Sequence, residues 1–250
     1  MLGKFTTTSE AVEHATSSLK NAKNEISKLS DGSETANGIL ELFGMSGKLW
    51  RHFLNNIASL EGIRYSEIGA HIGSTLCSAL YKNNNIGFAS SMDNWSQFTD
   101  AGNIQERLGN NITTTLEASN FDSSSEQSIK VFIDDFNTFD YTQLEPIDIY
   151  FFDGPHDEES QKNGILNAFD SLADIAIVLV DDWNWGSPRR GTFTALESLP
   201  ISIHYQCEIF TEPEGFIPSR DKNQFNVTRF AGSNWHNGVA IFVISKDSVS

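Results

Sequence analysis

The sequence predicts an α/β fold with a mostly parallel β-sheet that has helices on both faces. The main observation is that short apolar runs alternate with stretches of helical periodicity, which is typical of parallel strands buried between two helical layers. A second observation is that polar, glycine- or aspartate-containing turns follow the apolar runs. The expected strands are 65–68, 86–92, 129–133, 147–152 and 175–180, and the expected helices between them are 74–80, 104–120, 158–172 and 192–199.

Two later apolar runs, residues 201–210 and 239–244, have no helical stretch between them. We therefore expect an antiparallel C-terminal hairpin at the edge of the sheet, which brings the sheet to seven strands. The connection, residues 211–237, is polar and contains four turn-forming residues: Pro213, Gly215, Pro218 and Gly232. A connection of this length is expected to fold over a ligand site as a lid.

Residues 1–62 are predicted to form appended N-terminal helices packed on a domain of residues 63–250. Thr7 and Glu10 have the spacing of a capping box. One apolar stripe then follows at helical spacing: Ala11, Ala15, Leu19, Ala22, Ile26 and Leu29. A narrow stripe of small residues favours docking on the chain's own domain, and docking on another copy in a homo-oligomer is the alternative. A weaker helix is expected over 33–43 and a strongly apolar-faced one over 49–60.

The composition disfavours several classes of protein. The formal net charge of −16 disfavours binding to nucleic acid and to anionic membranes, because an acidic surface repels phosphates. There is no apolar run of 18 residues, and the first residues lack the apolar core of a signal peptide, so we expect a cytoplasmic protein. Cys77 and Cys207 fall in a predicted helix and a predicted strand, where buried thiols are expected rather than a disulfide.

A glycine turn follows the first predicted strand, with the pattern Glu67-x-Gly69-x-x-x-Gly73. Glycines suit a sharp strand-to-helix turn that a ligand approaches closely. A carboxylate at the rim of such a turn repels pyrophosphate and favours a cationic or hydroxyl-bearing ligand. Asp93 lies twenty residues beyond Gly73, where a Rossmann-like, doubly wound sheet places the acid that holds ribose hydroxyls. Six residues of the turn are candidate ligand contacts: Glu67, Gly69, Ala70, His71, Gly73 and Ser74.

Aspartates end four of the predicted strands: Asp93, Asp134 with Asp135, Asp153, and Asp181 with Asp182. Ligands of open α/β sheets bind beyond these carboxyl ends, and several acids at one rim are unfavourable without a cation. Asp153, Asp181 and Asp182 are therefore candidate ligands of Mg²⁺, with Mn²⁺ or Ca²⁺ as alternatives. His156 follows Asp153 by three residues, and either of the two is a candidate general base.

The glycine turn resembles the first motif of class I S-adenosylmethionine-dependent methyltransferases. A closer likeness, over roughly residues 45–244, is to their metal-dependent, small-molecule O-methyltransferase branch, which includes macrocin-type sugar methyltransferases. It rests on Met-Asp-Asn-Trp-Ser at 92–96, Phe-Asp-Gly-Pro-His at 152–156 and Val-Asp-Asp-Trp-Asn at 180–184. The resemblance implies S-adenosylmethionine as cofactor, with further contacts from five residues: Asp93, Asn94, Trp95, Asp135 and Phe136.

In this interpretation the protein moves a methyl group from S-adenosylmethionine to a hydroxyl of a small molecule, such as a sugar, a phenol or a natural product. A metal lowers the pKa of that hydroxyl. One alternative is a nicotinamide-dependent oxidoreductase, which Glu67 and the spacing of the glycine turn disfavour. Another is a non-catalytic nucleoside-binding module.

Other polar and aromatic residues near the motifs allow two interpretations. Trp183 and Trp185 are expected either to form an apolar wall for a ring-bearing ligand or to anchor the loop that follows. Arg189 and Arg190 are expected either to bind an anionic substrate group or to offset the acids. The remaining histidines belong to no motif and are interpreted as structural: His14, His52, His204 and His236.

Overall fold

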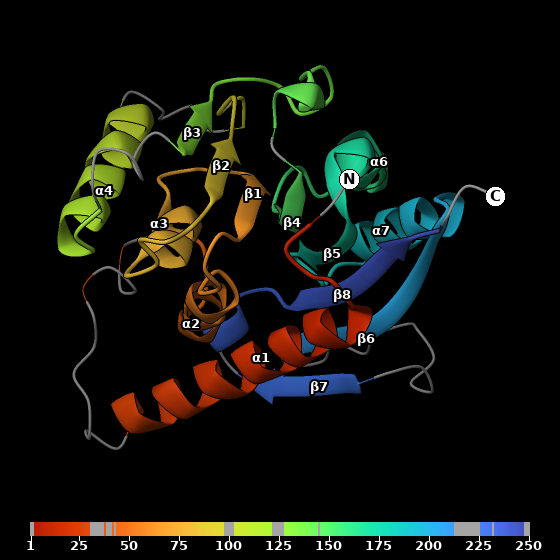
Figure 1. Cartoon of the computed structure of the whole chain (residues 1–250), viewed down its shortest axis with the longest axis horizontal. Coiled ribbons are helices and arrows are strands. Elements are labelled where there is room, and N and C mark those ends of the chain that lie inside the picture. Colours follow the sequence, from red (N-terminus) through yellow and green to blue (C-terminus); the bar gives the residue numbers. More distant parts are fainter. Residues whose placement is uncertain are drawn as a thin grey trace.

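The computed structural model describes residues 3–30, 38, 42, 44–97, 103–121, 128–144, 146–212, 226–231 and 233–247. Eight strands in these ranges form one sheet in the order β3-β2-β1-β4-β5-β8-β6-β7 (Figure 1). Five of them are parallel: β1 (Arg64–Ile68), β2 (Phe88–Met92), β3 (Ile129–Phe132), β4 (Ile147–Phe152) and β5 (Leu172–Val180). The predicted α/β fold with a mostly parallel sheet is confirmed.

The C-terminal strands complete the sheet. β8 (Val239–Lys246) lies antiparallel to β5, and β6 (Ile201–Glu212) lies antiparallel to β8. The seven predicted strands are therefore present. The predicted connection adds an eighth strand, β7 (Asn226–Ala231), which lies parallel to β6 at the edge of the sheet. The expected lid falls largely on residues 213–225 and 232, which lie outside the described residues.

Helices cover both faces of the sheet, so the core has two halves. One face of the sheet is covered by α1 (Thr8–Ser30), α2 (Lys48–Ile57) and α3 (Ser74–Leu80), and α4 (Ile104–Ala118) lies beside α3 (Figure 1). The other face is covered by α6 (Glu158–Ala168) and α7 (Gly186–Ser198). Short 3₁₀ helices are η2 (Tyr141–Gln143), η3 (Phe169–Ser171) and η4 (Ser233–Trp235).

The central strands explain why their apolar runs are continuous. Along β5, Ile177 and Leu179 belong to the core half under α1 and α2, whereas Val178 and Val180 belong to the half under α6 and α7. Successive side chains of a strand point to opposite faces, so a strand covered on both faces needs apolar residues at every position.

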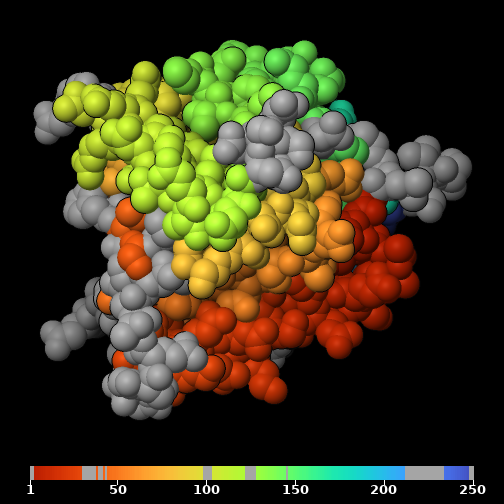
Figure 2. Space-filling view, turned by 60° about the vertical axis from the view of Figure 1, so that its left-hand side comes forward, coloured from red at the N-terminus to blue at the C-terminus, as the bar shows by residue number. Residues whose placement is uncertain are grey.

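The N-terminal helices dock on the sheet of their own chain. The predicted capping box forms, because Glu10 N donates to Thr7 Oγ1 (3.2 Å) and Thr7 N donates to Glu10 Oε2 (3.1 Å). In the predicted stripe Ala11, Ala15, Leu19 and Ala22 are buried in the core cluster that also contains α2 and the sheet. Figure 2 shows the red N-terminal segment along the lower side of the molecule, packed against the orange and yellow segments that follow it in the sequence. The weaker helix expected over 33–43 falls almost entirely outside the described residues.

Two further expectations concern the cysteines and the membrane. Cys77 and Cys207 are both buried free thiols, as predicted, and burial raises the pKa of Cys77 to about 12. Among the helices that the structure describes, none has the length and apolar character needed to cross a membrane.

Candidate functional site

A cavity of about 330 Å³ opens at the carboxyl ends of the parallel strands. It lies where β1 and β4 are neighbours, with β2 beyond one and β5 beyond the other, which is the position where doubly wound sheets bind ligands. Eight residues predicted from the sequence line it: Gly69, His71, Asp93, Asn94, Asp135, Phe136, Asp153 and His156. The other predicted residues are not among the described residues that line it: Glu67, Ala70, Gly73, Ser74, Trp95, Asp181 and Asp182.

The two glycines of the turn are required by the packing of the chain itself. Gly69 has a φ of +99°, and an added Cβ would collide with the carbonyl oxygen of Asp153. Gly73 has a φ of +84° at the start of α3, where a Cβ would collide with Leu108. Neighbouring protein atoms therefore require glycine at both positions, and Gly69 also lines the cavity.

Glu67 lies beneath the turn rather than at its rim, where it was expected. Its side chain is fully buried, and three hydroxyls donate to the carboxylate: Tyr65 at 2.6 Å, Ser91 at 2.8 Å and Thr75 at 3.2 Å. Burial raises the pKa of Glu67 to about 7, although these hydrogen bonds act in the opposite direction. Glu67 supports the loop from below and is not among the residues that line the cavity.

Asp93 joins the loops that follow β1 and β2. Its Oδ2 accepts from the backbone N–H of His71 (2.8 Å), and its Oδ1 accepts from that of Trp95 (2.7 Å). The Trp95 indole donates to the carbonyl of His71 (3.0 Å), and its ring is buried against Ala70 and Ile72. Trp95 was predicted to contact the cofactor, but its ring is part of the core beside the cavity and is not among the described residues that line it.

The loop after β3 forms another wall of the cavity. Asp135 Oδ1 accepts from Asn137 N (2.8 Å), and Asp135 Oδ2 accepts weakly from Asn94 (3.4 Å). The buried ring of Phe136 packs edge to face on Phe152, with ring centres 5.4 Å apart. The wall thus presents a carboxylate beside an apolar ring.

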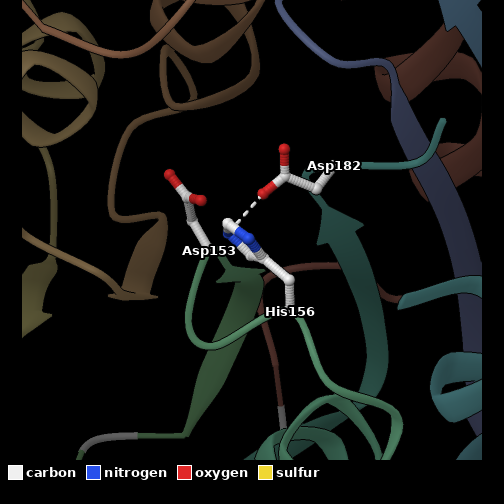
Figure 3. Close-up of side chains that lie close together, drawn as sticks. All are labelled: Asp153, His156 and Asp182. Carbon is white, nitrogen blue, oxygen red and sulfur yellow. Dashed lines mark ion pairs between the residues drawn. The ribbon is translucent and has the colours of Figure 1, made fainter. Parts of the chain in front are cut away.

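Three titratable side chains converge beyond β4 and β5. Asp153, His156 and Asp182 each offer one ligand atom, and these atoms lie within 4.8 Å of one another (Figure 3). His156 Nε2 is 2.6 Å from Asp182 Oδ2, while Asp182 Oδ1 accepts from the side-chain amide of Asn237 (2.8 Å). Figure 3 shows His156 rising from the loop after β4 towards Asp182, with Asp153 on its other side. We call these three residues the Asp–His cluster.

Asp181 is not part of the Asp–His cluster, so the structure brings together two of the three aspartates predicted as metal ligands, Asp153 and Asp182. Asp181 is buried, and its Oδ1 has no hydrogen-bond partner among the described residues. Burial, and then the charge of Asp182, raise the pKa of Asp181 well above its usual range.

The pKa values of the other two carboxyl groups, Asp153 and Asp182, are shifted in opposite directions. Burial raises the pKa of Asp153 well above its usual range, and the charges of Asp181 and Asp182 add to this effect. Burial alone would raise the pKa of Asp182 too, but hydrogen bonding and the charge of His156, with the Asn237 amide, hold it below its usual value. These opposite directions make Asp182 the more acidic of the two carboxyl groups.

The two tryptophans after β5 have different environments. Trp183 is fully buried, and its indole donates to Glu208 Oε2 (2.9 Å), so it anchors the loop. Trp185 is 43% exposed and packs edge to face on His156, with ring centres 4.5 Å apart. Of these two tryptophans, Trp185 is therefore the one that provides an apolar surface beside the Asp–His cluster.

The two arginines at the start of α7 have protein partners. Arg189 is buried, and it donates to the carbonyls of Trp183 (2.7 Å) and Asn184 (2.9 Å). Arg190 is paired with Glu158 at 2.6 Å on the surface. Arg189 therefore fixes the backbone that follows Asp182.

Sequence reasoning missed His236 and Asn237, which directly precede β8. Because β8 runs antiparallel to β5, with Ala240 opposite Val180, the residues before β8 lie at the same rim as those after β5. Burial lowers the pKa of His236, while the charge of Asp182 opposes this. The antiparallel hairpin was predicted from the sequence. Two polar residues directly before its last strand could therefore have been predicted to lie at the same rim as Asp182.

Comparisons with known proteins agree with this geometry. Residues 66–183 match a family model described as a methyltransferase domain. A search of curated proteins found no match. The predicted resemblance to class I S-adenosylmethionine-dependent methyltransferases is confirmed over these residues.

Three solved structures show the same fold at low identity. An O-methyltransferase from Bacillus cereus in complex with SAH has a TM-score of 0.55 at 13% identity, covering 88% of this chain and 96% of that one. Cofactor-bound Rv0187 from MTB has a TM-score of 0.52 at 14% identity, covering 90% of each chain. The O-methyltransferase TomG from Streptomyces achromogenes, involved in tomaymycin synthesis and bound to SAM, has a TM-score of 0.50 at 14% identity, covering 92% and 90%.

Proposed function

We propose that this protein transfers the methyl group of S-adenosylmethionine to a hydroxyl oxygen of a small molecule with the help of a divalent cation. The observation that carries the proposal is the position of the Asp–His cluster: Asp153 and His156 line the cavity at the switch point of the sheet. A methyl donor in the cavity and an acceptor at the cluster would then be neighbours. The similar structures described as complexes with SAH or SAM support the choice of donor.

The residues around the cavity suit a nucleoside with a positively charged group. Asp135 and Phe136 offer a hydrogen-bond acceptor and an apolar ring to an adenine. Asp93 keeps free lone pairs for ribose hydroxyls, since each of its oxygens accepts one backbone hydrogen bond and a carboxylate has about four lone-pair sites. S-adenosylmethionine supplies a methyl group on a cationic sulfur, and the acidic rim favours that charge.

The Asp–His cluster fits a hard divalent cation. Asp181 Oδ1 is buried without a hydrogen-bond partner among the described residues, and burial with the neighbouring carboxylates raises the pKa values of Asp153 and Asp181, so a cation would relieve the crowding of these acids. Carboxylate oxygens are the preferred ligands of Mg²⁺, with Mn²⁺ and Ca²⁺ as alternatives, and Asp153 and Asp182 would hold the ion. Bound there, the ion would lower the pKa of an acceptor hydroxyl.

His156 is the residue that we assign to proton removal. An ionised Asp182 can only accept a hydrogen bond, so Nε2 of His156 carries the proton in their 2.6 Å contact and Nδ1 carries the lone pair. Asp182 and the ring of Trp185 hold the imidazole in place. The acceptor proton is transferred to Nδ1, and the acceptor oxygen bonds to the methyl carbon in line with the sulfur while the carbon–sulfur bond breaks, which leaves S-adenosylhomocysteine. Asp153 is the rival base, and its raised pKa disfavours it when no cation is bound.

A small molecule is the acceptor class that the charge favours. The formal net charge of −16 repels a nucleic-acid backbone, and the exposed Trp185 offers an apolar surface beside the cluster. These two features favour an uncharged, ring-bearing alcohol or phenol over RNA.

Transfer of an isotopic methyl group tests the proposal. Purified protein is incubated with labelled S-adenosylmethionine and with sugars, catechols or RNA, in Mg²⁺ or in excess chelator. We expect labelled methyl ether from a small molecule, in Mg²⁺ only. Asp153→Asn should abolish it, while the exposed control Glu159→Gln should not. Label on RNA alone, or full turnover in chelator, would contradict the proposal.

A further inference from the structure

A set of hydrogen bonds joins the segment before β8 to the turn after β5. Trp183 N donates to the carbonyl of Gly238 (3.0 Å), and Asn184 N donates to the carbonyl of Asn237 (2.7 Å). Gly238 has a φ of +85°, and an added Cβ there would lie 2.7 Å from the side-chain oxygen of Asn184. The two segments are therefore held in one fixed register next to Asp182.

Side chains strengthen the same junction. Asn184 Nδ2 donates to Thr211 Oγ1 (2.6 Å), Thr211 N donates to Asn184 Oδ1 (3.0 Å), and Thr211 Oγ1 donates to the carbonyl of His236 (2.8 Å). On the other side the buried ring of Trp235 packs with Trp50 of α2, with ring centres 6.1 Å apart. The segment from 235 to 238 is thus anchored at both ends, and one end rests on an N-terminal helix.

This junction brings the side chain of Asn237 to the Asp–His cluster. Asp182 has a φ of +54°, a left-handed conformation that is rare outside glycine and that Asp tolerates best. Its Oδ1 accepts from Asn237 (2.8 Å), and its Oδ2 contacts His156 (2.6 Å). Hydrogen bonds on both oxygens prevent rotation of the carboxylate, so Oδ2 keeps facing His156.

We infer that Asn237 is a positioning residue that holds the Asp182 carboxylate in the orientation needed by the Asp–His cluster. The inference rests on the proposed function, because the orientation of the Asp182 carboxylate matters for the binding of the proposed cation. An amide suits this position because it donates to a carboxylate without adding charge. Outer partners that orient a metal-binding carboxylate typically contribute 10- to 100-fold to metal affinity.

The test compares Asn237→Ala with a matched control, Asn83→Ala. The control also removes a half-buried amide with two hydrogen bonds, to the carbonyls of Asn55 and Ala79. Affinities for Mn²⁺ and for S-adenosylhomocysteine are measured by calorimetry, with urea unfolding as the check on folding. We expect Asn237→Ala to bind Mn²⁺ about 10- to 100-fold more weakly, with unchanged S-adenosylhomocysteine affinity. The control should keep both affinities. Unchanged Mn²⁺ affinity in Asn237→Ala would overturn the inference.

A metal-free measurement separates this inference from the proposed function. Crystal structures of the wild type and of Asn237→Ala without metal should show the Asp182 carboxylate turned away from His156 in the variant only. If the wild type binds no Mn²⁺, the metal part of the proposed function fails, but the two structures still test the inference. An Asp182 carboxylate that keeps its orientation in Asn237→Ala overturns the inference. Asn237→Ser, whose side chain is too short to reach Oδ1, replaces the alanine variant if that variant does not fold.

Discussion

Replacing Glu67 by glutamine should remove a specific pH dependence of stability. In the folded protein burial raises the pKa of Glu67 from 4.5 to about 7. The folded state therefore holds this proton to higher pH than the unfolded state does. The resulting stabilisation is fully present below pH 4.5, and it is lost as the pH rises to about 7. Each pKa unit corresponds to about 1.4 kcal/mol, so the wild type should lose about 3 kcal/mol across this range through Glu67 alone.

Urea unfolding of the wild type and Glu67→Gln between pH 4.5 and 8 measures this contribution. Other titrating groups cancel in the difference between the two free energies of unfolding, so the difference isolates Glu67. We expect the wild type to lose about 3 kcal/mol relative to the variant as the pH rises. The hydroxyls of Tyr65, Ser91 and Thr75 can reorient towards an amide, so the variant should fold. The exposed Glu61→Gln is the control, and a pH-independent difference for Glu67→Gln would refute the reasoning.

Three further variants test the turn and the Asp–His cluster. Gly69→Ala should destabilise the protein by about 1–3 kcal/mol in urea unfolding, since the φ and the Asp153 carbonyl exclude a Cβ, whereas Gly109→Ala, with open space around it, should not. Asp182→Asn should lose Mg²⁺ affinity in calorimetry but keep S-adenosylhomocysteine affinity; equal Mg²⁺ affinity would exclude Asp182 as a ligand. His156→Ala should lower the rate of methyl transfer by about 10²–10⁴-fold at saturating Mg²⁺, and a near-normal rate would assign proton removal to Asp153.

The sequence predicted the sheet because its signals are local and periodic. The continuous apolar runs of β4 and β5 reflect burial on both faces, and each run ends at the rim where the chain turns. This rule predicted that Asp93, Asp135 and Asp153 lie at one rim, since the carboxyl ends of parallel strands meet at one edge, and all three line the cavity. The capping box of Thr7 and Glu10 is equally local, and it also formed as predicted.

The direction of individual side chains was not predictable from the sequence. In the sequence, Glu67 and Trp95 are close to residues that line the cavity. Both side chains nevertheless point into the core, where hydroxyls surround Glu67 and apolar residues surround Trp95. Whether a polar side chain next to a turn faces the ligand or the core depends on tertiary partners such as Tyr65. Asn237 depends on the pairing of β8 with β5, which is a contact between residues distant in the chain.

The central claim is most directly tested by calorimetric titration of the wild type with S-adenosylhomocysteine and, separately, with NAD. We expect one S-adenosylhomocysteine to bind per chain, to raise the free energy of unfolding by about 2.7 kcal/mol at a hundred times its dissociation constant, and to bind more weakly to Asp135→Ala. NAD should give no heat of binding at the same concentrations. Binding of NAD without binding of S-adenosylhomocysteine would contradict the proposed methyl transfer.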